Sequence, residues 1–411
     1  MSACREIERC RVGASAHLIP VLNLGRQALT GVFPRRPADP VTEGPLELVW
    51  CPESGLLQLR HSYDPKEMYG ENYGYRSGLN QSMVNHLAAK VAMLEKAVPL
   101  APGDAVLDIG SNDATLLKAY RSAGIRRIGI DPTGAKFKAH YPPEIALVPE
   151  FFSARAYRAV EKRPARIVTS IAMFYDLESP IDFARQVESI LAADGVWHFE
   201  QSYMPSMLRL NSYDTICHEH LEYYSLSVVK RILDESGLRL VDVVMNSVNG
   251  GSFAVTAVKA ASAARANGAV IDWMLEQEER MGLSTPRPYR EFEERVFRHR
   301  EDLARLIRSL NGDGKRILGY GASTKGNVVL QFCGLTAADI PAIAEVNEEK
   351  FGRVTPGTHI PIVSEAEARA MAPDYYLVLP WHFKDGILRR EQEFLAGGGR
   401  FIFPFPEIEI V

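Results

Sequence analysis

The sequence predicts an α/β protein in three parts: a small, mostly β N-terminal module, a central α/β domain and a second, smaller α/β C-terminal domain. Expected strands and helices alternate twice, within residues 105–200 and again within 316–379. A parallel crossover needs a helix-sized connection, so this alternation indicates two parallel sheets. The length of 411 residues also allows two or three domains, at roughly 150 residues per domain.

The three parts are expected to divide near residues 80 and 260. Residues 1–80 are rich in turn formers and short apolar runs, which is typical of β-strands and loops. Apolar positions recur at helical spacing over 82–97, so an amphipathic helix is expected to lead into the central domain at 81–259. The segment 260–311 is helix-prone and charged, and within 260–411 it is expected to connect to the C-terminal domain.

Each element of the two α/β domains is predicted from its own apolar pattern. In the central domain we expect strands at 105–109, 127–131, 166–170, 196–200 and 253–258, with helices at 115–122 and 181–191. In the C-terminal domain we expect strands at 316–320, 343–346 and 374–379, with a helix at 328–333.

The composition argues against several classes of protein. The formal net charge is −4 without a basic block, which disfavours nucleic acid or an anionic membrane as the main partner. No apolar run reaches the roughly 20 residues of a membrane helix, and the first residues lack the apolar core of a signal peptide. Five scattered cysteines do not suit a disulfide framework. We therefore expect a cytoplasmic protein; the sequence carries no signal for its oligomeric state.

The clearest motif is a strand that ends in an acidic residue and turns through a glycine into a helix, at 106–114. Ligands of doubly wound sheets lie beyond the carboxyl ends of the strands, and Gly110 would let the backbone approach a cofactor without a Cβ clash. Asp131, about 20 residues further on, suits hydrogen bonds from both ribose hydroxyls. No G-x-G-x-x-G follows this strand, which disfavours a dinucleotide. S-adenosylmethionine is the favoured ligand, with another nucleotide or no ligand as alternatives.

A second candidate site lies in the segment 215–225, where His218, Glu219, His220 and Glu222 fall within five positions. Such groups are expensive to bury unpaired. A histidine that titrates near neutrality, steered by a carboxylate, suits removal of a proton next to a carbonyl group. A metal site and a solvated polar loop are the alternatives, although His-x-His alone is a weak metal motif.

Two glycine-containing turns complete the candidate sites. The pair Gly250 and Gly251 suits close approach of the backbone to a ligand, or a plain β-turn. The turn at 319–327 follows a strand and opens a helix, and its amides, two hydroxyls and Lys325 together suit an anion such as a phosphate or pyrophosphate. Glu345 lies about 20 residues downstream, as a dinucleotide fingerprint would require, but the third glycine is missing. A turn without a ligand is the alternative.

Taken in order, these motifs resemble the sugar C-methyltransferase family, which methylates nucleotide-linked keto sugars in deoxysugar biosynthesis. The resemblance runs nearly end to end. It is carried by Asn-Leu-Gly-Arg-Gln-Ala-Leu at 23–29, Tyr-Gly-Tyr at 73–75, Leu-Asp-Ile-Gly-Ser-Asn-Asp at 107–113, His-Glu-His-Leu at 218–221, Asn-Gly-Gly-Ser at 249–252, Gly-Tyr-Gly-Ala-Ser-Thr-Lys at 319–325 and Phe-Pro-Phe-Pro-Glu-Ile at 403–408.

The resemblance implies an N-terminal zinc module, a central Rossmann-like class I methyltransferase domain that binds S-adenosylmethionine, and a C-terminal domain that helps hold the nucleotide sugar. It implies catalytic roles for His220, Glu219, Tyr75, Tyr73 and Asp176. The expected cofactor-binding residues are Asp108, Gly110, Asn112, Asp113, Asp131, Phe152 and Tyr175. The expected substrate-binding residues are His218, Asn249, Gly250, Gly251, Tyr320, Ser323, Thr324, Lys325 and Asn327.

The sequence departs from the family pattern at several positions. Of the four cysteines usual in the zinc module only Cys10 and Cys51 remain, and structural zinc normally takes four N or S ligands. We therefore expect zinc to be weakly bound or absent, and assign no metal ligand. Cys217 replaces a tyrosine, Asp176 or its neighbour Tyr175 replaces a histidine found in some members, and Ala114 replaces a glycine.

We therefore expect a methyltransferase in which His220, oriented by Glu219, removes a proton next to the keto group of a nucleotide-linked 4-keto-6-deoxysugar. The resulting enolate would attack the methyl group, with Tyr73, Tyr75 and Asp176 holding sugar hydroxyls or the enolate oxygen. C3 is the favoured carbon and C5 the other; the sequence does not identify the sugar or the nucleotide. The alternatives are a nicotinamide-dependent nucleotide-sugar oxidoreductase, an O- or N-methyltransferase and a non-catalytic binding protein.

Overall fold

The largest sheet of the computed structural model, which describes residues 4–69 and 75–411, has seven strands in the order β12-β13-β10-β9-β6-β7-β8. The strands are β6 (Ala105–Ile109), β7 (Arg126–Ile130), β8 (Ile145–Val148), β9 (Ala165–Ile171), β10 (Leu191–Ser202), β12 (Leu238–Asn246) and β13 (Ser252–Lys259). The five strands from β8 to β10 pair in parallel, and β13 runs antiparallel to both of its neighbours. The predicted parallel sheet is confirmed; β8 and β12 were not predicted.

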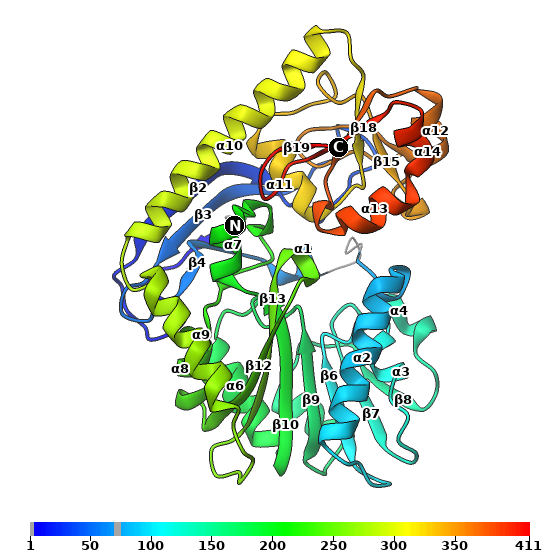
Figure 1. Ribbon diagram of the computed structural model, residues 1–411. Coiled ribbons are helices and arrows are strands. Elements are labelled where there is room, and N and C mark those ends of the chain that lie inside the picture. Colours follow the sequence, from blue (N-terminus) through cyan, green and yellow to red (C-terminus); the bar gives the residue numbers. More distant parts are fainter. Residues whose placement is uncertain (1–3, 70–74) are drawn as a thin grey trace.

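Helices cover both faces of this sheet (Figure 1). On one face α2 (Gln81–Ala97) and α3 (Thr115–Lys118) pack their apolar side chains against β6 and β9. On the other face lie α5 (Ala154–Val160), α6 (Pro180–Ile190) and α8 (Leu226–Glu235), joined by α9 (Gly268–Met281). Asn80 accepts a hydrogen bond from the Ser82 amide and so caps α2, which confirms the helix predicted from 82.

The helix predicted over 115–122 is shorter than expected, because α3 ends at Lys118. The next backbone donors find partners outside a helix. Both carboxylate oxygens of Glu95, on α2, accept hydrogen bonds from the amide of Arg121, and one also accepts from that of Ser122, over 2.8–3.2 Å. A side chain of the neighbouring helix therefore replaces the intrahelical acceptors.

The N-terminal module is mostly β, as predicted. Strand β1 (Cys4–Glu6) pairs with β5 (His61–Tyr63), and β2 (Ile19–Ala28), β3 (Glu43–Trp50) and β4 (Leu57–Leu59) form an antiparallel sheet. A fourth strand of this sheet, β11 (Glu222–Tyr223), comes from the central part of the sequence and pairs with β4. It directly follows the predicted His218–His220 segment, so the N-terminal sheet fixes one end of that segment.

The C-terminal part contains a second parallel sheet with the strand order β16-β15-β14-β17-β18-β19. Its strands are β14 (Ile317–Tyr320), β15 (Ile343–Glu345), β16 (Ile362–Ser364), β17 (Tyr375–Val378), β18 (Arg400–Phe403) and the antiparallel β19 (Glu409–Ile410). Helix α11 (Thr324–Phe332) begins four residues before its predicted start, because the Ser323 hydroxyl caps it by accepting from the Gly326 amide. The strands β16, β18 and β19 were not predicted.

Shorter helices complete the chain. They are α1 (Pro65–Met68), η1 (Ser77–Leu79), α4 (Gly134–Phe137), η2 (Lys138–His140), α7 (Met204–Leu210), η3 (Tyr213–Thr215), η4 (Val248–Gly250), η5 (Glu348–Lys350), α12 (Glu365–Ala370), η6 (Trp381–Phe383), α13 (Lys384–Arg390) and α14 (Gln392–Ala396). Within the described residues, every helix is too short or too polar to cross a membrane.

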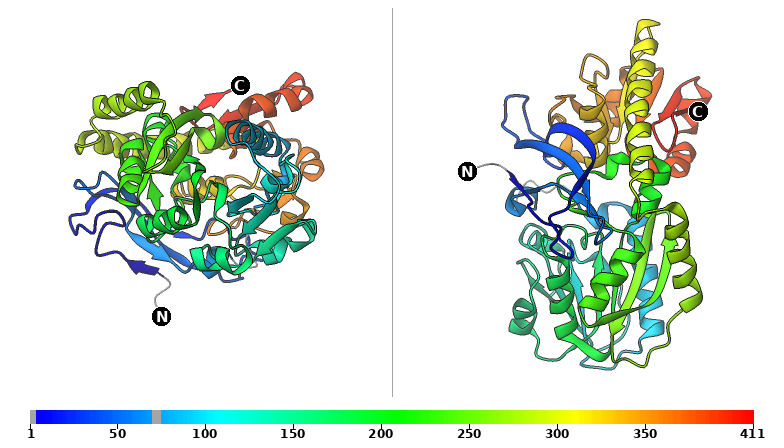
Figure 2. Two further views of the ribbon diagram at one scale, coloured as in Figure 1. Left: turned by 90° about the horizontal axis from the view of Figure 1, so that it is seen from below. Right: turned by 90° about the vertical axis from the view of Figure 1, so that its left-hand side faces the viewer.

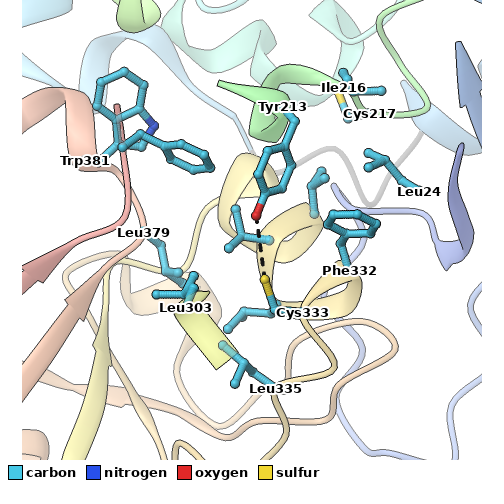
Figure 3. Packing of buried hydrophobic residues seen from close by; sticks show 14 of the residues in the cluster. Leu24, Tyr213, Ile216, Cys217, Leu303, Phe332, Cys333, Leu335, Leu379 and Trp381 are labelled. Carbon is cyan, nitrogen blue, oxygen red and sulfur yellow. Dashed lines mark hydrogen bonds between the residues drawn. The ribbon is translucent and has the colours of Figure 1, made fainter. Parts of the chain in front are cut away.

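One apolar core joins the three parts. Leu24 of the N-terminal module, Tyr213 of the central part and Cys333 of the C-terminal part belong to the same buried cluster, and the Tyr213 hydroxyl lies 3.6 Å from the Cys333 sulfur (Figure 3). The long helix α10 (Arg287–Gly312) contacts β2, α7 and β14. The side view in Figure 2 shows the N-terminal strands beside the junction of the other two parts. The predicted α/β fold class is confirmed, while the domain boundaries stay a prediction.

Candidate active site

A cavity of about 780 Å³ lies between the two parallel sheets. It is lined by the turns that follow β6 and β7 in the central sheet and by those that follow β14 and β15 in the C-terminal sheet. In each sheet the strand order reverses beside the first strand, between β6 and β9 and between β14 and β17. Ligands of doubly wound sheets bind at such switch points. Two binding positions therefore open into one cavity.

Fifteen of the residues predicted from the sequence line this cavity. They are Tyr75, Asp108, Gly110, Asn112, Asp131, Phe152, Tyr175, Asp176, Glu219, His220, Asn249, Tyr320, Ser323, Thr324 and Lys325. Their positions in the sequence range from the segment before α2 to the start of α11. The fold therefore brings motifs that are far apart in the sequence into one cavity. Tyr73 lies outside the described residues. The individual roles stay predictions.

The glycine turn after β6 lines the cavity, and both its backbone angle and a neighbouring side chain favour glycine at position 110. Gly110 adopts a φ of +75°, and a Cβ at this position would lie 3.1 Å from the Cγ of Met173. The carboxylate of Asp131 accepts hydrogen bonds from the Asn112 amide at 2.7 Å and from the Thr133 amide at 2.6 Å. These bonds fix the carboxylate at the mouth of the β6–β7 crevice. Oδ1 also accepts from the Thr133 hydroxyl at 2.6 Å, so Oδ2 is the oxygen that keeps further acceptor capacity.

Two other predicted cofactor residues hold the surrounding backbone. The Asn112 side chain accepts from the Ser77 amide and donates to the Tyr75 carbonyl, and Asp113 accepts from the Gly78 amide. Asp113 does not line the cavity among the described residues; it ties the segment before α2 to the cofactor turn. Burial raises the pKa of Asp108 to about 7, although a 2.6 Å hydrogen bond from Thr169 opposes this effect.

His220 is held in one tautomer. Its Nδ1 lies 2.9 Å from the Thr215 carbonyl oxygen, which can only accept, so Nδ1 carries the proton and Nε2 is left as a basic nitrogen. The imidazole ring packs against the ring of Tyr175, with 4.2 Å between the ring centroids and an angle of 56° between the ring planes. Burial lowers the pKa of His220 to about 4, and the positive charge of Lys325 acts in the same direction. The ring is therefore neutral at physiological pH.

Glu219 does not have the place expected for a carboxylate that orients His220. The Thr215 carbonyl takes that position, while the Glu219 carboxylate faces the N-terminal module, where a Cβ on Gly31 would lie 2.6 Å from Oε1. The other oxygen, Oε2, is buried without a hydrogen-bond partner among the described residues. Burial raises the pKa of Glu219. The Thr215 carbonyl, and not Glu219, therefore holds Nδ1 of His220 in this structure, and the role of Glu219 stays a prediction.

A second acidic group, Asp176, lies in the same part of the cavity. Burial raises its pKa well above the usual range, the negative charge of Glu219 adds to the rise, and a hydrogen bond from Tyr69 opposes it. Its Oδ1 is buried without a partner in the described part of the chain. Cys217, which also lines the cavity, has its thiol pKa raised by burial and by these two acids. Asp176 can therefore keep a proton and donate it in a hydrogen bond.

The turn after β14 presents cations and amides to the other end of the cavity. Lys325, at the start of α11, donates to the Asn249 carbonyl at 2.7 Å, and burial lowers its pKa while Asp214 raises it. Glu345 is already occupied, since Oε2 accepts from the Ala322 amide and Oε1 accepts from the amides of Val346 and Asn347. These bonds organise the turn, and only Oε2 keeps further acceptor capacity, as Oδ2 does in Asp131.

Four of the predicted substrate-binding residues contact other parts of the protein and are not among the described residues that line the cavity. His218 is fully buried and packs edge-on against Tyr63, 4.7 Å between centroids. Asn327 donates to the Thr30 carbonyl at 2.7 Å. A Cβ on Gly250 would lie 3.0 Å from Trp381, and one on Gly251 would lie 2.9 Å from the Cβ of Ser206. Protein neighbours and the positive φ angles therefore account for the glycine pair, and its contact with substrate stays a prediction.

Sequence reasoning missed several lining residues. Glu200, at the end of β10, bonds His86 and Lys90 of α2 at 2.6 Å each and accepts from Asn246 at 2.6 Å. The hydrogen bond from His86 and the charge of Lys90 hold its pKa below the usual range, although burial alone would raise it. Gln201 and Arg390 also line the cavity. No motif marks Glu200, Gln201 or Arg390. The signal that could have found them is their position, since two lie near the end of a strand and one lies on a helix beside a switch point.

The residues at the four expected zinc positions do not fit a structural zinc ion. Gly13 and Ser54 stand where the second cysteine of each pair is usual, and the Cys10 sulfur lies 3.1 Å from the Ser54 hydroxyl. Cys51 donates to Glu53 at 3.4 Å. Burial raises the pKa of the Cys10 thiol, which disfavours a thiolate ligand. Weak or absent zinc binding stays a prediction.

Comparison with known proteins identifies the family. Family models match at 10–69 ("Putative zinc binding domain"), at 81–243 (methyltransferase domain) and at 247–406 (C-methyltransferase C-terminal domain). The chain is 34% identical over 411 residues to the C-methyltransferase NovU of Streptomyces niveus, covering 99% of this chain and 97% of the relative. The chain belongs to the C-methyltransferase family. The enzyme class predicted from the sequence, an S-adenosylmethionine-dependent methyltransferase, is confirmed.

Solved structures match part of the chain at low identity. Magnesium protoporphyrin IX methyltransferase of Synechocystis PCC 6803 is 16% identical, with a TM-score of 0.32 over 43% of this chain and 83% of its own. An S-adenosylmethionine-dependent methyltransferase of Clostridium acetobutylicum ATCC 824 is 10% identical, with a TM-score of 0.33 over 43% of this chain and 92% of its own.

Proposed function

We propose that this C-methyltransferase transfers a methyl group from S-adenosylmethionine to a ring carbon next to the keto group of a nucleotide-linked 4-keto-6-deoxysugar, with C3 as the favoured carbon. One observation carries the proposal: His220, whose Nδ1 holds the proton, lines the same cavity as the turns at Gly110 and Asp131 of one sheet and the turn at 319–327 of the other. The base would thus act between a nucleoside cofactor and a phosphorylated acceptor.

The cofactor end of the cavity has the groups that an adenosyl ligand needs. Asp131 is fixed at the end of β7 by two backbone amides and the Thr133 hydroxyl, and its Oδ2 can accept a hydrogen bond from a ribose hydroxyl. Gly110 leaves room for the amino-acid part. Phe152 lines the same end, where an aromatic ring can cover a base. S-adenosylmethionine supplies an electrophilic methyl group on a sulfonium sulfur.

The acceptor is activated by loss of a proton. Nε2 of His220 takes the proton from the carbon next to the keto group, and the electron pair of that C–H bond forms the enolate. The enolate carbon then forms the new C–CH3 bond, while the electrons of the broken S–CH3 bond stay on sulfur. The Thr215 carbonyl stabilises the imidazolium through Nδ1–H, and the proton later passes to water.

Negative charge on the enolate oxygen needs a hydrogen-bond donor. Asp176 fits this role, because burial raises its pKa and so favours the protonated form, and one of its oxygens has no partner among the described residues. Donors aimed at developing charge in a dry site are an efficient means of lowering a barrier. Tyr75 lies in the same cavity and is proposed, with Tyr73, to hold sugar hydroxyls.

The nucleotide part is proposed to lie against the C-terminal sheet. The first amides of α11, with Thr324 and Lys325, offer donors and positive charge to a diphosphate. Arg390, which contacts Tyr320 and Glu365, adds a further cation at this end of the cavity. A free sugar would lack these contacts, which supports a nucleotide-linked acceptor.

The direct test is incubation of the chain with S-adenosylmethionine and a panel of nucleotide-linked 4-keto-6-deoxysugars, followed by mass spectrometry and NMR of the products. The proposal requires at least one product that is heavier by one methyl group, with the new methyl group on carbon. Methylation of oxygen or nitrogen, or of no member of the panel, would contradict it.

A further inference from the structure

Gln201 is a buried amide that has no partner in the protein. It stands near the carboxyl end of β10, is 1% exposed and lines the cavity. Neither Oε1 nor Nε2 has a hydrogen-bond partner within residues 4–69 and 75–411. A buried amide is unfavourable unless its donor and acceptor are satisfied, so the contents of the cavity are expected to supply the missing partners.

The adjacent residue, Glu200, is fully paired within the protein, whereas Gln201 shares its lack of partners with the cavity-lining Asp176 and Glu219, each of which has one unpaired oxygen among the described residues. Glu200 points to the opposite face of the strand, where His86, Lys90 and Asn246 satisfy it. Elsewhere in the chain, Gln331 has both amide atoms bonded to the backbone of Ala28, at 2.7 and 3.2 Å. Two other buried glutamines, Gln27 and Gln58, each have one amide atom paired and one unpaired among the described residues, so Gln201 differs from them in having neither atom paired.

The position of β10 in the sheet indicates which ligand Gln201 meets. The ribose-binding Asp131 follows β7, on one side of β6, whereas β10 lies on the other side of β6 beyond β9. Asp176 follows β9, so Gln201 belongs to the acceptor half of the cavity. A side-chain amide offers one donor and one acceptor side by side, which suits two neighbouring oxygens of which at least one is a hydroxyl.

We propose that Gln201 is a specificity-determining residue that binds the oxygens on two neighbouring ring carbons of the acceptor sugar. Its Nε2–H donates to one oxygen, and its Oε1 accepts from the hydroxyl group that contains the other. This inference rests on the proposed function for the identity of the acceptor. It assigns to β10 a substrate-binding role that the sequence motifs did not indicate. It also gives a reason for a polar residue on the strand face that is otherwise formed by the apolar side chains of Phe199 and Trp197.

The test is Gln201→Met, which keeps the shape of the side chain and removes both hydrogen-bonding groups. Because the amide has no protein partner, the melting temperature of the ligand-free variant should be equal to or higher than that of the wild type. The KM for the methylated panel sugar should rise about 10- to 100-fold, roughly tenfold for each hydrogen bond lost. The dissociation constant for S-adenosylmethionine, measured by calorimetry, should not change.

A matched control and a substrate analogue make the test specific. Gln331→Met removes an amide that is fully paired to Ala28, so it should lower the melting temperature and leave the acceptor KM unchanged. An acceptor that lacks the hydroxyl contacted by Gln201 should bind the wild type more weakly than the full sugar does, whereas Gln201→Met should bind the two acceptors equally well. The deoxy position that shows this loss identifies the oxygens that Gln201 contacts.

Three results would overturn the inference. A lower melting temperature of Gln201→Met with an unchanged acceptor KM would make the residue structural. A weaker affinity for S-adenosylmethionine with an unchanged acceptor KM would place Gln201 at the cofactor. If the wild type methylates no panel sugar, the proposed function fails and the acceptor assignment fails with it, whereas a methylating wild type with an unaffected variant refutes the role of Gln201 alone.

Discussion

Replacing His218 by phenylalanine is expected to flatten the loss of stability at acidic pH without changing acceptor binding. The His218 ring is fully buried, packs edge-on against Tyr63 and lies outside the cavity lining of the described residues. Burial lowers its pKa to about 4. Phenylalanine preserves an aromatic ring at this contact but cannot bind a proton.

The size of the effect follows from the pKa difference between the two states. Below pH 6.5 the unfolded chain takes up a proton at His218 that the folded chain refuses, so stability is lost as the pH falls from 6.5 to about 4. With these two values the loss is about 2 kcal/mol at pH 5 relative to pH 7.5. Other buried histidines add to the slope in both proteins, and the comparison with the variant isolates the share of His218.

The assay is urea unfolding of the wild type and His218→Phe at pH 7.5 and pH 5. The wild type should lose about 2 kcal/mol more than the variant over this interval, and the acceptor KM should be the same for both. Parallel pH profiles would show that the residue is not held neutral by burial. A higher acceptor KM of the variant would restore the substrate-binding role expected from the sequence.

Three further predictions concern the cofactor, the nucleotide and the zinc module. Asp131→Ala should weaken S-adenosylmethionine binding by at least about tenfold in calorimetry, because a charge-assisted hydrogen bond to the ribose is lost; an unchanged affinity would move the ribose elsewhere. Lys325→Met should raise the KM of a nucleotide-linked acceptor by about tenfold or more, because a cation next to the phosphates is lost; an unchanged KM would contradict the diphosphate site. Metal analysis of the purified chain should find far less than one zinc per chain, and a chelator should leave the melting temperature unchanged, because Ser54 and Gly13 replace two thiolates. One tightly bound zinc per chain would show that other ligands complete the site.

The parts of the site that the sequence predicted well are turns that follow buried strands. Gly110, Asp131 and Lys325 are each recognised from a local pattern, a strand followed by a glycine turn and a helix, and the structure places all three in one cavity. Such turns are local in sequence, and a parallel sheet brings their strand ends to a common edge.

The parts that the sequence predicted poorly depend on contacts between distant segments. Gly250 resembles a ligand-binding glycine, but a side chain at this position would collide with Trp381, which lies 131 residues further along the sequence. The position next to Nδ1 of His220, expected for Glu219, is taken by the carbonyl of Thr215, a backbone group that carries no sequence signal. Gln201 belongs to no sequence motif. It is recognised only in the structure, where its buried amide lacks hydrogen-bond partners among the described residues.

The central claim, that His220 forms an enolate of the acceptor, is tested most directly by hydrogen exchange. The chain is incubated in deuterated water with S-adenosylhomocysteine and the nucleotide-linked 4-keto-6-deoxysugar that it methylates, and the sugar is followed by NMR. The account predicts deuterium at the carbon that becomes methylated, with an exchange rate about 100- to 10,000-fold lower in His220→Ala and unchanged cofactor affinity. Exchange and methylation at wild-type rates in His220→Ala would contradict the account.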